Sequence, residues 1–365
     1  MSSDLQIQYD LQLINKQKEL ANLLNPFYSG PITTYASSPQ HYRMRAEFRI
    51  WHEGTDTFHI MFNQQTKEKY KVDNLPAANL LINMAMKEVI EKVISSQELR
   101  TKLFQIDYLS STTNELVISM IYHKKLTPEW ISAAEDLQTH LAHLGKINII
   151  GRAKKQKLVL GSDYVNECLS INGQTYVFKQ IENSFTQPNA SINVNMIEWV
   201  AENASQNQTD LLELYCGAGN FTIPLGRSFR KVFATEISKT SVNAAHENIK
   251  SNNANNIEIA RLSSEEFVEA YNKVREFKRL KAIQLDTYDF TSVLVDPPRA
   301  GLDPGTLKLI SQFEHIIYIS CNPQTLAENL EQLSNSHQIK AAAIFDQFPF
   351  TPHIESGVIL SKNNK

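Results

Sequence analysis

The sequence has little cysteine: Cys168, Cys216 and Cys321 are its only three thiols, and no two of them stand in a CxxC spacing. Three cysteines cannot build a disulfide framework, and without CxxC pairs a zinc site or an iron–sulfur cluster is disfavoured. No apolar run reaches the roughly 18 residues that a transmembrane helix requires, and the N-terminal MSSDLQIQYD lacks the basic and apolar parts of a signal peptide. These absences predict a reduced, cytoplasmic protein without a membrane segment or a metal.

The chain also lacks a strong excess of charge of either sign. It carries 36 Lys and Arg against 39 Asp and Glu, a formal net charge of −3. Residues 1–180 are slightly basic and residues 181–365 are acidic. General binding of nucleic acid by a polycationic chain is therefore excluded, and any nucleic-acid contact would have to use local basic patches.

The N-terminal part begins with a helix-like pattern. Residues 5–24 carry apolar side chains at helical spacing, which predicts an amphipathic helix. Residues 25–39 contain several prolines and a glycine, which predicts a loop. We therefore expect residues 1–42 to form an N-terminal helix and a linker.

The periodicity changes after this linker. Residues 41–50 alternate between apolar and polar side chains, which predicts a half-buried strand whose charged face carries Arg43, Arg45 and Arg49. Two hairpins, two helices and two further strand segments follow without a simple alternation. Residues 43–180 are therefore expected to form a separate α+β domain.

The last part of the chain alternates regularly between strand and helix patterns. Seven short apolar runs lie between residues 211 and 360, and polar helical segments separate the first six of them. Buried parallel strands that alternate with helices define a doubly wound α/β sheet. Residues 181–365 are therefore expected to form a seven-stranded, Rossmann-like domain.

A glycine-rich turn follows the first of these apolar runs. In LLELYCGAGNF, Gly217 and Gly219 permit a tight turn and a close approach of a ligand to the backbone. Glu236 ends the second run, where a carboxylate can accept hydrogen bonds from both hydroxyls of a ribose. Thr222 replaces the third glycine of a dinucleotide fingerprint, which disfavours NAD and leaves S-adenosylmethionine as the better ligand. A structural strand-to-helix turn with a capping acid is the alternative interpretation.

Cys321 stands where another apolar run ends and Asn322-Pro323 begins a helix. Ligands of an open α/β sheet bind at the carboxyl ends of its strands, and a helix N-terminus favours the thiolate form of a nearby thiol. The position indicates a nucleophile, although a lone cysteine is more often a buried core residue. Cys216 is interpreted as packing, because a cofactor should occupy the space beside the glycine turn.

Three more residues are candidates for chemistry. Asp296 ends a strand before two prolines, a position that also suits a turn-forming aspartate. Amino-methyltransferases have an aromatic residue after a similar Asp/Asn-Pro-Pro, but Arg299 stands here, and a guanidinium suits a phosphate or carbonyl oxygen. Glu355 can act as a general base, with His353 a weaker candidate. An ordinary surface residue is the alternative for both Arg299 and Glu355.

Several motifs occur together, namely ENSFTQPNA, LELYCGAGNF, DPPRAGL, SCNPQTL and FDQFPFTPHIE. This set resembles the RNA 5-methyluridine methyltransferases, and SCNP with DPPR is its most discriminating pair. HYRMRAEFRIWHEG, FNQQTKEKY, KLFQIDYL, YHKKL and VREFKRL extend the resemblance over nearly the whole chain, to the bacterial tRNA (uracil-5-)-methyltransferases of the TrmA type. The rRNA-modifying relatives usually have an extra N-terminal domain and a cluster held by four cysteines, so their absence here favours tRNA as the substrate.

The resemblance implies roles for particular residues. Residues 181–365 would be a class I (Rossmann-like) S-adenosylmethionine-dependent methyltransferase domain and residues 43–180 an RNA-binding domain, with no metal and no iron–sulfur cluster. Cys321 would be the nucleophile and Glu355 the proton acceptor. The implied contacts are Gln187, Tyr215, Gly217, Asn220, Glu236 and Asp296 for S-adenosylmethionine, and Phe104 and Arg299 for RNA.

The reaction that the resemblance implies is methyl transfer to C5 of a uridine in the T-loop of the tRNA T-arm, at position 54. The T-loop mimic of tmRNA is expected as a second substrate. The protein is expected to act as a monomer, and the helix over residues 5–24 is expected to dock on the catalytic domain.

This reaction explains why these residue types are needed. Uracil C5 is too weak a nucleophile to attack a sulfonium methyl group until a thiolate adds to C6. Cys321 would add, C5 would take the methyl group in line, and Glu355 would remove the C5 proton before the thiolate leaves. Gln187 or Asp296 would stabilise the enolate. Because the uridine is stacked inside tRNA, the base must first be extruded.

Local basic clusters are candidates for holding the RNA. They are the strand face with Arg43, Arg45 and Arg49, the pair Lys124-Lys125, and residues 152–157, with Phe104 filling vacated stacking space. A solvated strand face is the alternative for each cluster. Two other functions stay open: an amino-methyltransferase, which needs no thiol, and a role in tRNA folding, which can coexist with methylation.

Overall fold

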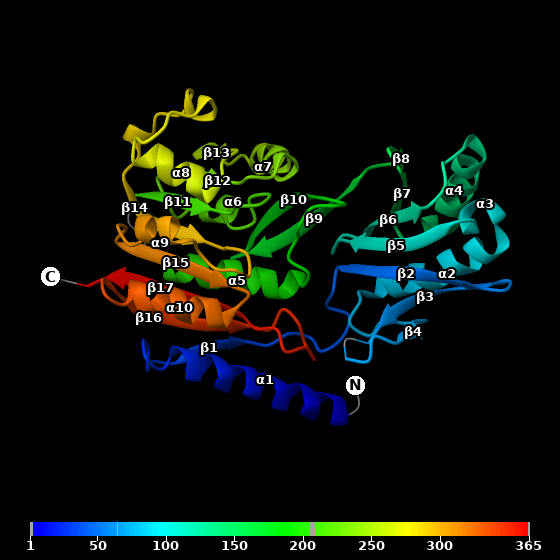
Figure 1. The fold of residues 1–365 in the computed structure, drawn as a ribbon, viewed down its shortest axis with the longest axis horizontal. Coiled ribbons are helices and arrows are strands. Elements are labelled where there is room, and N and C mark those ends of the chain that lie inside the picture. Colours follow the sequence, from blue (N-terminus) through cyan, green and yellow to red (C-terminus); the bar gives the residue numbers. More distant parts are fainter. Residues whose placement is uncertain (1–2, 64, 205–208, 364–365) are drawn as a thin grey trace. The chain divides into compact units, whose positions relative to one another are not determined.

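The computed structural model describes residues 3–63, 65–204 and 209–363 (Figure 1). The chain forms two compact units: the first comprises residues 1–39, 169–178 and 191–365, and the second comprises 40–168 and 179–190. The expected boundary at residue 180 therefore shifts, because the hairpin of β9 (Tyr164–Ile171) and β10 (Gln174–Ile181) contributes its turn and the flanking residues to the first unit. The N-terminal segment also belongs to the first unit.

The first unit is built on a sheet whose described strands have the order β1-β16-β17-β15-β14-β11-β12-β13. Neighbouring strands are parallel except for β17, which runs antiparallel to both β15 and β16. The seven expected strands are β11 (Asp210–Leu214), β12 (Lys231–Thr235), β13 (Ile257–Ala260), β14 (Phe290–Val295), β15 (His315–Ser320), β16 (His337–Phe345) and β17 (Glu355–Lys362). The Rossmann-like α/β fold that the sequence predicts is therefore present.

An additional strand, β1 (Ile32–Tyr35), corrects the loop that was expected over residues 25–39. It pairs in parallel with β16, with Ile32 opposite Ala342 and Tyr35 opposite Phe345. Its sequence ITTY favours a strand, but four residues are too short for a clear periodicity. The strand forms because the edge of β16 offers backbone hydrogen-bonding groups that need partners.

Helices pack along this sheet (Figure 1). They are α1 (Ser3–Leu24), α5 (Ala190–Asn203), α6 (Thr222–Leu225), α7 (Lys239–Ser251), α8 (Ser264–Tyr271), α9 (Pro304–Ile310) and α10 (Pro323–Leu333), with short 3-10 helices η2 (Lys278–Leu280) and η3 (Leu285–Thr287). Leu20 and Leu24 of α1 lie in one buried cluster with Leu326 and Leu330 of α10. Burying each such leucine stabilises the fold by roughly 1.5–3 kcal/mol, so α1 is an integral part of the first unit.

The second unit is an α+β structure with its own core. Its strands have the order β4-β3-β2-β5-β6-β7-β8 and are β2 (Arg45–Glu53), β3 (Asp56–Phe62), β4 (Lys69–Lys71), β5 (Leu103–Ser110), β6 (Glu115–Tyr122), β7 (Lys146–Ala153) and β8 (Gln156–Leu160). Its helices are α2 (Leu80–Ser95), α3 (Gln97–Arg100), α4 (Pro128–Leu141) and the 3-10 helix η1 (Ala142–Leu144). In β2, Ala46, Phe48 and Ile50 are buried, which is the alternation that the sequence predicts.

Candidate active site and RNA-binding surface

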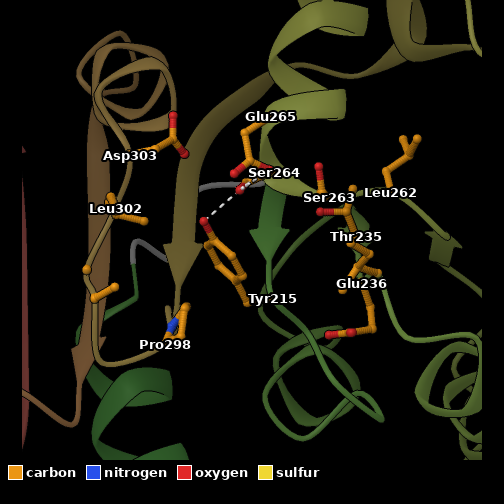
Figure 2. A pocket seen from close by; sticks show the side chains of 13 residues that line it. Tyr215, Thr235, Glu236, Leu262, Ser263, Ser264, Glu265, Pro298, Leu302 and Asp303 are labelled. Atoms are coloured by element: carbon orange, nitrogen blue, oxygen red, sulfur yellow. Dashed lines mark hydrogen bonds between the residues drawn. The ribbon is translucent and has the colours of Figure 1, made fainter.

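A pocket of about 580 Å³ opens at the carboxyl ends of β11, β12 and β13. Tyr215 and Glu236, two of the residues predicted to bind the cofactor, line this pocket. Figure 2 shows Glu236 and Asp303 on opposite sides of it, with Tyr215 between them. This is the edge at which open α/β sheets bind their ligands.

The glycine turn and the acidic residue at the end of β12 are joined by hydrogen bonds. Glu236 accepts one from the backbone N–H of Gly217 at 3.1 Å and another from that of Ser238 at 2.7 Å. Gly217 has a φ of +57°, and no atom lies within 4 Å of the place where a side-chain carbon would stand. The turn therefore leaves open space beside a carboxylate whose further lone pairs can accept hydrogen bonds from a ligand.

Tyr215 projects into this pocket from a strained backbone conformation. Its φ is +65°, which is uncommon for a residue other than glycine. Its hydroxyl donates a hydrogen bond to Ser264 Oγ at 2.6 Å (Figure 2), and burial is the main cause of its raised pKa. Most of the other lining residues could not be picked out in the sequence, among them Ser264, which no pattern marks, and Ile237, which is 63% exposed directly after Glu236.

Asn220 and Gln187, two further predicted cofactor contacts, have different surroundings. The side-chain amide of Asn220 exchanges two hydrogen bonds of 2.8 Å with that of Asn193 on α5. This pair fixes the end of the glycine turn against α5. Gln187 lies in the second unit, directly before Pro188, whose carbonyl accepts a hydrogen bond from the N–H of Met44. A cofactor contact of Gln187 therefore stays a prediction.

The sheet topology brings Asp296, Cys321 and Glu355 to one edge. Asp296 directly follows β14 and Cys321 directly follows β15, and these two strands are parallel neighbours. Glu355 is the first residue of β17, which pairs antiparallel with β15 so that Ser320 lies opposite Ser356. Because an antiparallel strand begins where its parallel neighbours end, all three side chains belong to the same edge.

The electrostatic surroundings raise the pKa of the Cys321 thiol to about 11. Burial is the largest cause, the negative charges of Glu355 and Asp296 come next, and Arg299 opposes them. Any contribution of the next helix's start to the thiolate is therefore smaller than the combined effect of burial and the two carboxylates. The helix start itself is capped by the side chain of Asn322, which accepts a hydrogen bond from the N–H of Gln324 at 3.2 Å.

The two carboxyls of this edge also favour their protonated forms. Burial raises the pKa of Asp296 to about 7. The pKa of Glu355 is raised well above its usual range, first by burial and then by the charge of Asp296, with Arg299 acting in the opposite direction. The side chain of Glu355 is nearly inaccessible, with 4% exposure. Titratable groups with such shifts are typical of catalytic sites.

Arg299 connects the segments that carry these residues. Its carbonyl oxygen accepts hydrogen bonds from Asn322 Nδ2 at 3.0 Å and Thr325 Oγ1 at 3.3 Å, which ties the loop after β14 to the start of α10. Its guanidinium is exposed and lies 3.5 Å from His353 Nδ1. Arg299, which was predicted to contact RNA, is therefore a cation close to the thiol of Cys321 and to Glu355.

In the second unit, three features predicted separately line one pocket of about 870 Å³. They are Phe104, the pair Lys124-Lys125 and part of the basic run at residues 152–157. The ring of Phe104 lies 4.0 Å from that of His123, and the guanidinium of Arg49 lies 5.2 Å from the centre of the Phe104 ring. We call these residues the basic pocket. An aromatic ring surrounded by exposed cations is a surface that suits single-stranded RNA.

Arg43, which precedes β2, and Arg45, the first residue of β2, have other partners. Arg43 donates a hydrogen bond from Nε to the carbonyl of Arg45 at 2.8 Å. Arg45 is half-buried and lines a small cavity with Glu47, Asp107 and other residues of the second unit, and burial lowers its pKa. Of the arginines predicted on one strand face, the structure places Arg49 beside Phe104 and directs Arg45 towards carboxylates.

Neither a metal cluster nor a membrane helix is found in the part of the chain that the structure describes. No group of three or more His, Cys, Asp or Glu side chains there could hold a metal ion. None of its helices is both long and apolar enough to cross a membrane.

The fold and the pocket of the first unit define a class I methyltransferase that uses S-adenosylmethionine. A doubly wound sheet, a G-x-G turn after its first strand and an acid after the second are the elements that bind this cofactor. The family model described as tRNA (Uracil-5-)-methyltransferase matches residues 8–363. This chain therefore belongs to that family.

Individual relatives agree with this assignment. A protein of Mannheimia succiniciproducens named tRNA/tmRNA (uracil-C(5))-methyltransferase is 53% identical, and the match covers 96% of this chain and 97% of the relative. A protein of the same name from Haemophilus influenzae is 52% identical over 97% of this chain and 98% of its own. The crystal structure of Pyrococcus abyssi tRNA (uracil-54, C5)-methyltransferase with S-adenosyl-L-homocysteine has a TM-score of 0.72 and 22% identity, covering 96% and 83% of the two chains. That structure supports the fold.

Proposed function

We propose that this protein transfers the methyl group of S-adenosylmethionine to C5 of uridine 54 in the T-loop of tRNA, and to the equivalent uridine of tmRNA. The observation that carries the proposal is the convergence of Asp296, Cys321 and Glu355 at adjacent strand ends in a chain of this family. The names of the relatives support tRNA and tmRNA as the substrates. Because these RNAs are found in the cytoplasm, we expect the protein to act there, and a monomer stays a prediction.

The pocket beside Glu236 suits the nucleoside part of S-adenosylmethionine. The carboxylate of Glu236 is held by two backbone amides and can accept hydrogen bonds from the ribose hydroxyls. The exposed side chain of Ile237 offers an apolar face to the adenine ring, and the open space beside Gly217 admits the rest of the ligand. When bound, S-adenosylmethionine supplies an electrophilic methyl group.

Cys321 would act first, by adding its thiolate to C6 of the uracil so that C5 becomes nucleophilic. The raised pKa of this thiol means that little thiolate exists in the protein alone. The charged forms of Asp296 and Cys321 would be favoured if the positive sulfur of a bound methyl donor lay near them. Formation of the nucleophile would therefore depend on the methyl donor, which limits unwanted reactions of the thiol.

Glu355 would act after the methyl group has been transferred. C5 then carries both the methyl group and the original hydrogen, and Glu355 accepts that hydrogen as a proton. The electrons of the C5–H bond form the C5–C6 double bond, and the C6–sulfur bond breaks to return the thiolate of Cys321. The cation of Arg299 favours the ionised form of Glu355 that this step requires.

The basic pocket of the second unit would hold the RNA strand. Lys125, Lys154 and Lys155 are exposed and can neutralise phosphates. Phe104 can stack on a base, which compensates for the stacking that is lost when the target uridine is extruded.

A tRNA transcript that contains 5-fluorouridine tests this proposal. Fluorine cannot leave C5 as a proton, so the protein and the RNA should stay covalently joined after methyl transfer. We expect a complex that resists denaturation with the wild type and with Cys168→Ala, and none with Cys321→Ala. An amino-methyltransferase would form no such complex, and its product would carry the methyl group on adenine or guanine. Nucleoside analysis of ordinary tRNA after methylation distinguishes the two.

A further inference from the structure

The loop that leads to Glu355 is held by the N-terminal segment of the chain. This loop, residues 346–354, connects Phe345 at the end of β16 with Glu355 at the start of β17. Its first residue, Asp346, donates its N–H to the carbonyl of Tyr35 in β1 at 3.0 Å. Helix α1 contacts Asp346, Phe348, Phe350 and Thr351, so two N-terminal elements contact the segment that precedes Glu355. We call residues 346–354 the Glu355 loop.

Lys16 of α1 makes a buried ion pair with this loop. Its Nζ lies 2.7 Å from Asp346 Oδ1, and the two side chains are 5% and 0% exposed. The same ammonium donates a hydrogen bond to the carbonyl of Phe348 at 2.9 Å. A buried charge pair is a specific connection, because either charge alone would be left desolvated without its partner.

Gln12, one turn before Lys16, makes a second polar connection. Its Nε2 donates a hydrogen bond to the carbonyl of Thr351 at 2.8 Å, and its Oε1 accepts one from the N–H of Phe350 at 2.7 Å. The ring of Tyr9 packs edge-on against that of Phe350, with 5.9 Å between the ring centres. The side-chain amide of Gln12 therefore pairs with the loop backbone as a neighbouring strand would.

The C-terminal end of the Glu355 loop lies beside Arg299, next to the residues proposed for catalysis. His353 lies 3.5 Å from the guanidinium of Arg299, and Glu355 follows two residues later. The loop thus has one side held by α1 and the other side in contact with the cation beside Cys321. The loop ends at Glu355, whose backbone pairs with Phe345 in the sheet, so these contacts lie directly before the residue that carries the carboxyl group.

We infer that Gln12 and Lys16 are positioning residues for the methyl transfer reaction, which hold the Glu355 loop so that Glu355 can remove the C5 proton. This inference rests on the proposed function. The step it concerns is the last one, in which the C5 proton passes to Glu355, the C5–C6 double bond forms and the C6–sulfur bond breaks. Proton transfer requires the two heavy atoms to be within hydrogen-bond reach, and a displacement of about 1 Å can lower a rate by roughly 100-fold.

Gln12→Ala tests the inference with little disturbance of the core, because Gln12 is only half-buried. Gln8→Ala is the matched control: it makes the same change one turn earlier on the same helix, at an exposed side chain. For Gln12→Ala we expect kcat with tRNA to fall about tenfold, and the KM for S-adenosylmethionine to stay within twofold. Because the last step is slowed, the methylated covalent complex of Cys321 and ordinary tRNA should accumulate.

The covalent complex distinguishes positioning from general weakening of the fold. A partly unfolded protein would lose activity without accumulating the complex, which is measured by denaturing electrophoresis after rapid mixing. If Gln12→Ala and Gln8→Ala have the same kcat and accumulate the same amount of covalent complex, the inference is overturned. If the wild type makes no 5-methyluridine at all, the proposed function fails instead.

Lys16 requires a paired substitution, because Lys16→Met alone would leave the carboxylate of Asp346 buried without its cation. Lys16→Met combined with Asp346→Asn removes both charges and keeps similar shapes. We expect this double variant to accumulate the same covalent complex while its thermal unfolding stays cooperative. A folded double variant with wild-type kcat would contradict a positioning role for Lys16.

Discussion

The edge of the sheet at Cys321 and the basic pocket at Phe104 differ in how far their titratable side chains are exposed to solvent. At the first, the side chain of Glu355 is buried and those of Asp296 and Cys321 are partly buried, and burial raises the pKa of all three. At the second, lysines such as Lys125 and Lys154 remain exposed to solvent. Proton transfer and bond formation require groups that can gain or lose a proton. Binding RNA requires side chains that stay positively charged.

This contrast suggests that substitutions at the first site affect turnover and that substitutions at the second affect binding. It also suggests a division between the two units, since the first contains the sheet edge and the second contains the basic pocket. The predictions below test this contrast, beginning with the largest expected effect.

Glu355→Gln should have the largest effect on turnover. The amide has a similar shape but cannot accept the C5 proton, so we expect kcat to fall by about 10³-fold, within the range found for a general base. The affinity for tRNA should change by less than threefold. Single-turnover kinetics with electrophoresis should show the covalent complex as the main species. A variant that turns over normally would show that another group accepts the proton.

The reactivity of Cys321 should be low in the protein alone. With a pKa of about 11, this thiol at pH 8 contains roughly 100-fold less thiolate than an ordinary cysteine. Alkylation by iodoacetamide, followed by mass spectrometry of the Cys321 peptide, should therefore increase up to about pH 11. S-adenosylmethionine should lower the pH at which the reaction rises, whereas S-adenosylhomocysteine, which lacks the positive sulfur, should not. A midpoint below pH 8 without ligand would show that the helix start dominates.

Removing cations from the basic pocket should weaken RNA binding without affecting chemistry. Lys125→Gln combined with Lys154→Gln removes two exposed charges. We expect the Kd for tRNA to rise about tenfold at physiological salt, and the slope of log Kd against log salt to decrease by about two. The kcat at saturating tRNA should be unchanged. Lys87→Gln, on the exposed surface of α2, is the control, and equal effects of both variants would remove the pocket from the RNA interface.

A buried carboxyl outside the reaction should affect only stability. Glu213 in β11 is 1% exposed, its Oε2 has no hydrogen-bond partner, and burial raises its pKa to about 8. A raised folded-state pKa means that the folded protein binds more protons than the unfolded chain between about pH 4.5 and 8, so stability decreases as pH rises through this window.

The measurement is thermal unfolding at a series of pH values from 5 to 8. The free energy of unfolding of Glu213→Gln should decrease less steeply with rising pH than that of the wild type. The difference in slope should be up to about 1.4 kcal/mol per pH unit. Glu331→Gln, at an exposed position on α10, should follow the wild-type curve. If Glu213→Gln has the same slope as the wild type, Glu213 is not held in its protonated form by burial.

Some parts of the fold could be predicted because their signals are local. The alternation of apolar runs and helical segments indicates the doubly wound sheet, and the G-x-G turn with Glu236 indicates the cofactor pocket. Asp296 and Cys321 could be placed together because each ends a strand of a parallel sheet. Family membership, predicted from the motifs, is confirmed by the family model over residues 8–363.

Other parts could not be predicted because they depend on partners that are distant in sequence. The strand at Ile32–Tyr35 forms only because β16 has an open edge. The basic pocket joins Phe104 to a run that begins nearly fifty residues later. The amphipathic pattern of α1 predicted a helix, but not that Lys16 and Gln12 hold the Glu355 loop.

The sequence by itself determined the class of fold, because hydrophobic periodicity and turn residues are local signals. The resemblance of its motifs indicated the family and, with it, the thiol nucleophile proposed for the reaction. Only the tertiary structure decided that β17 runs antiparallel beside β15, and this brings Glu355 to the edge that Cys321 occupies. It also decided the direction of the thiol's pKa. Burial and the charges of Glu355 and Asp296 outweigh the favourable start of a helix, and these depend on how distant segments pack.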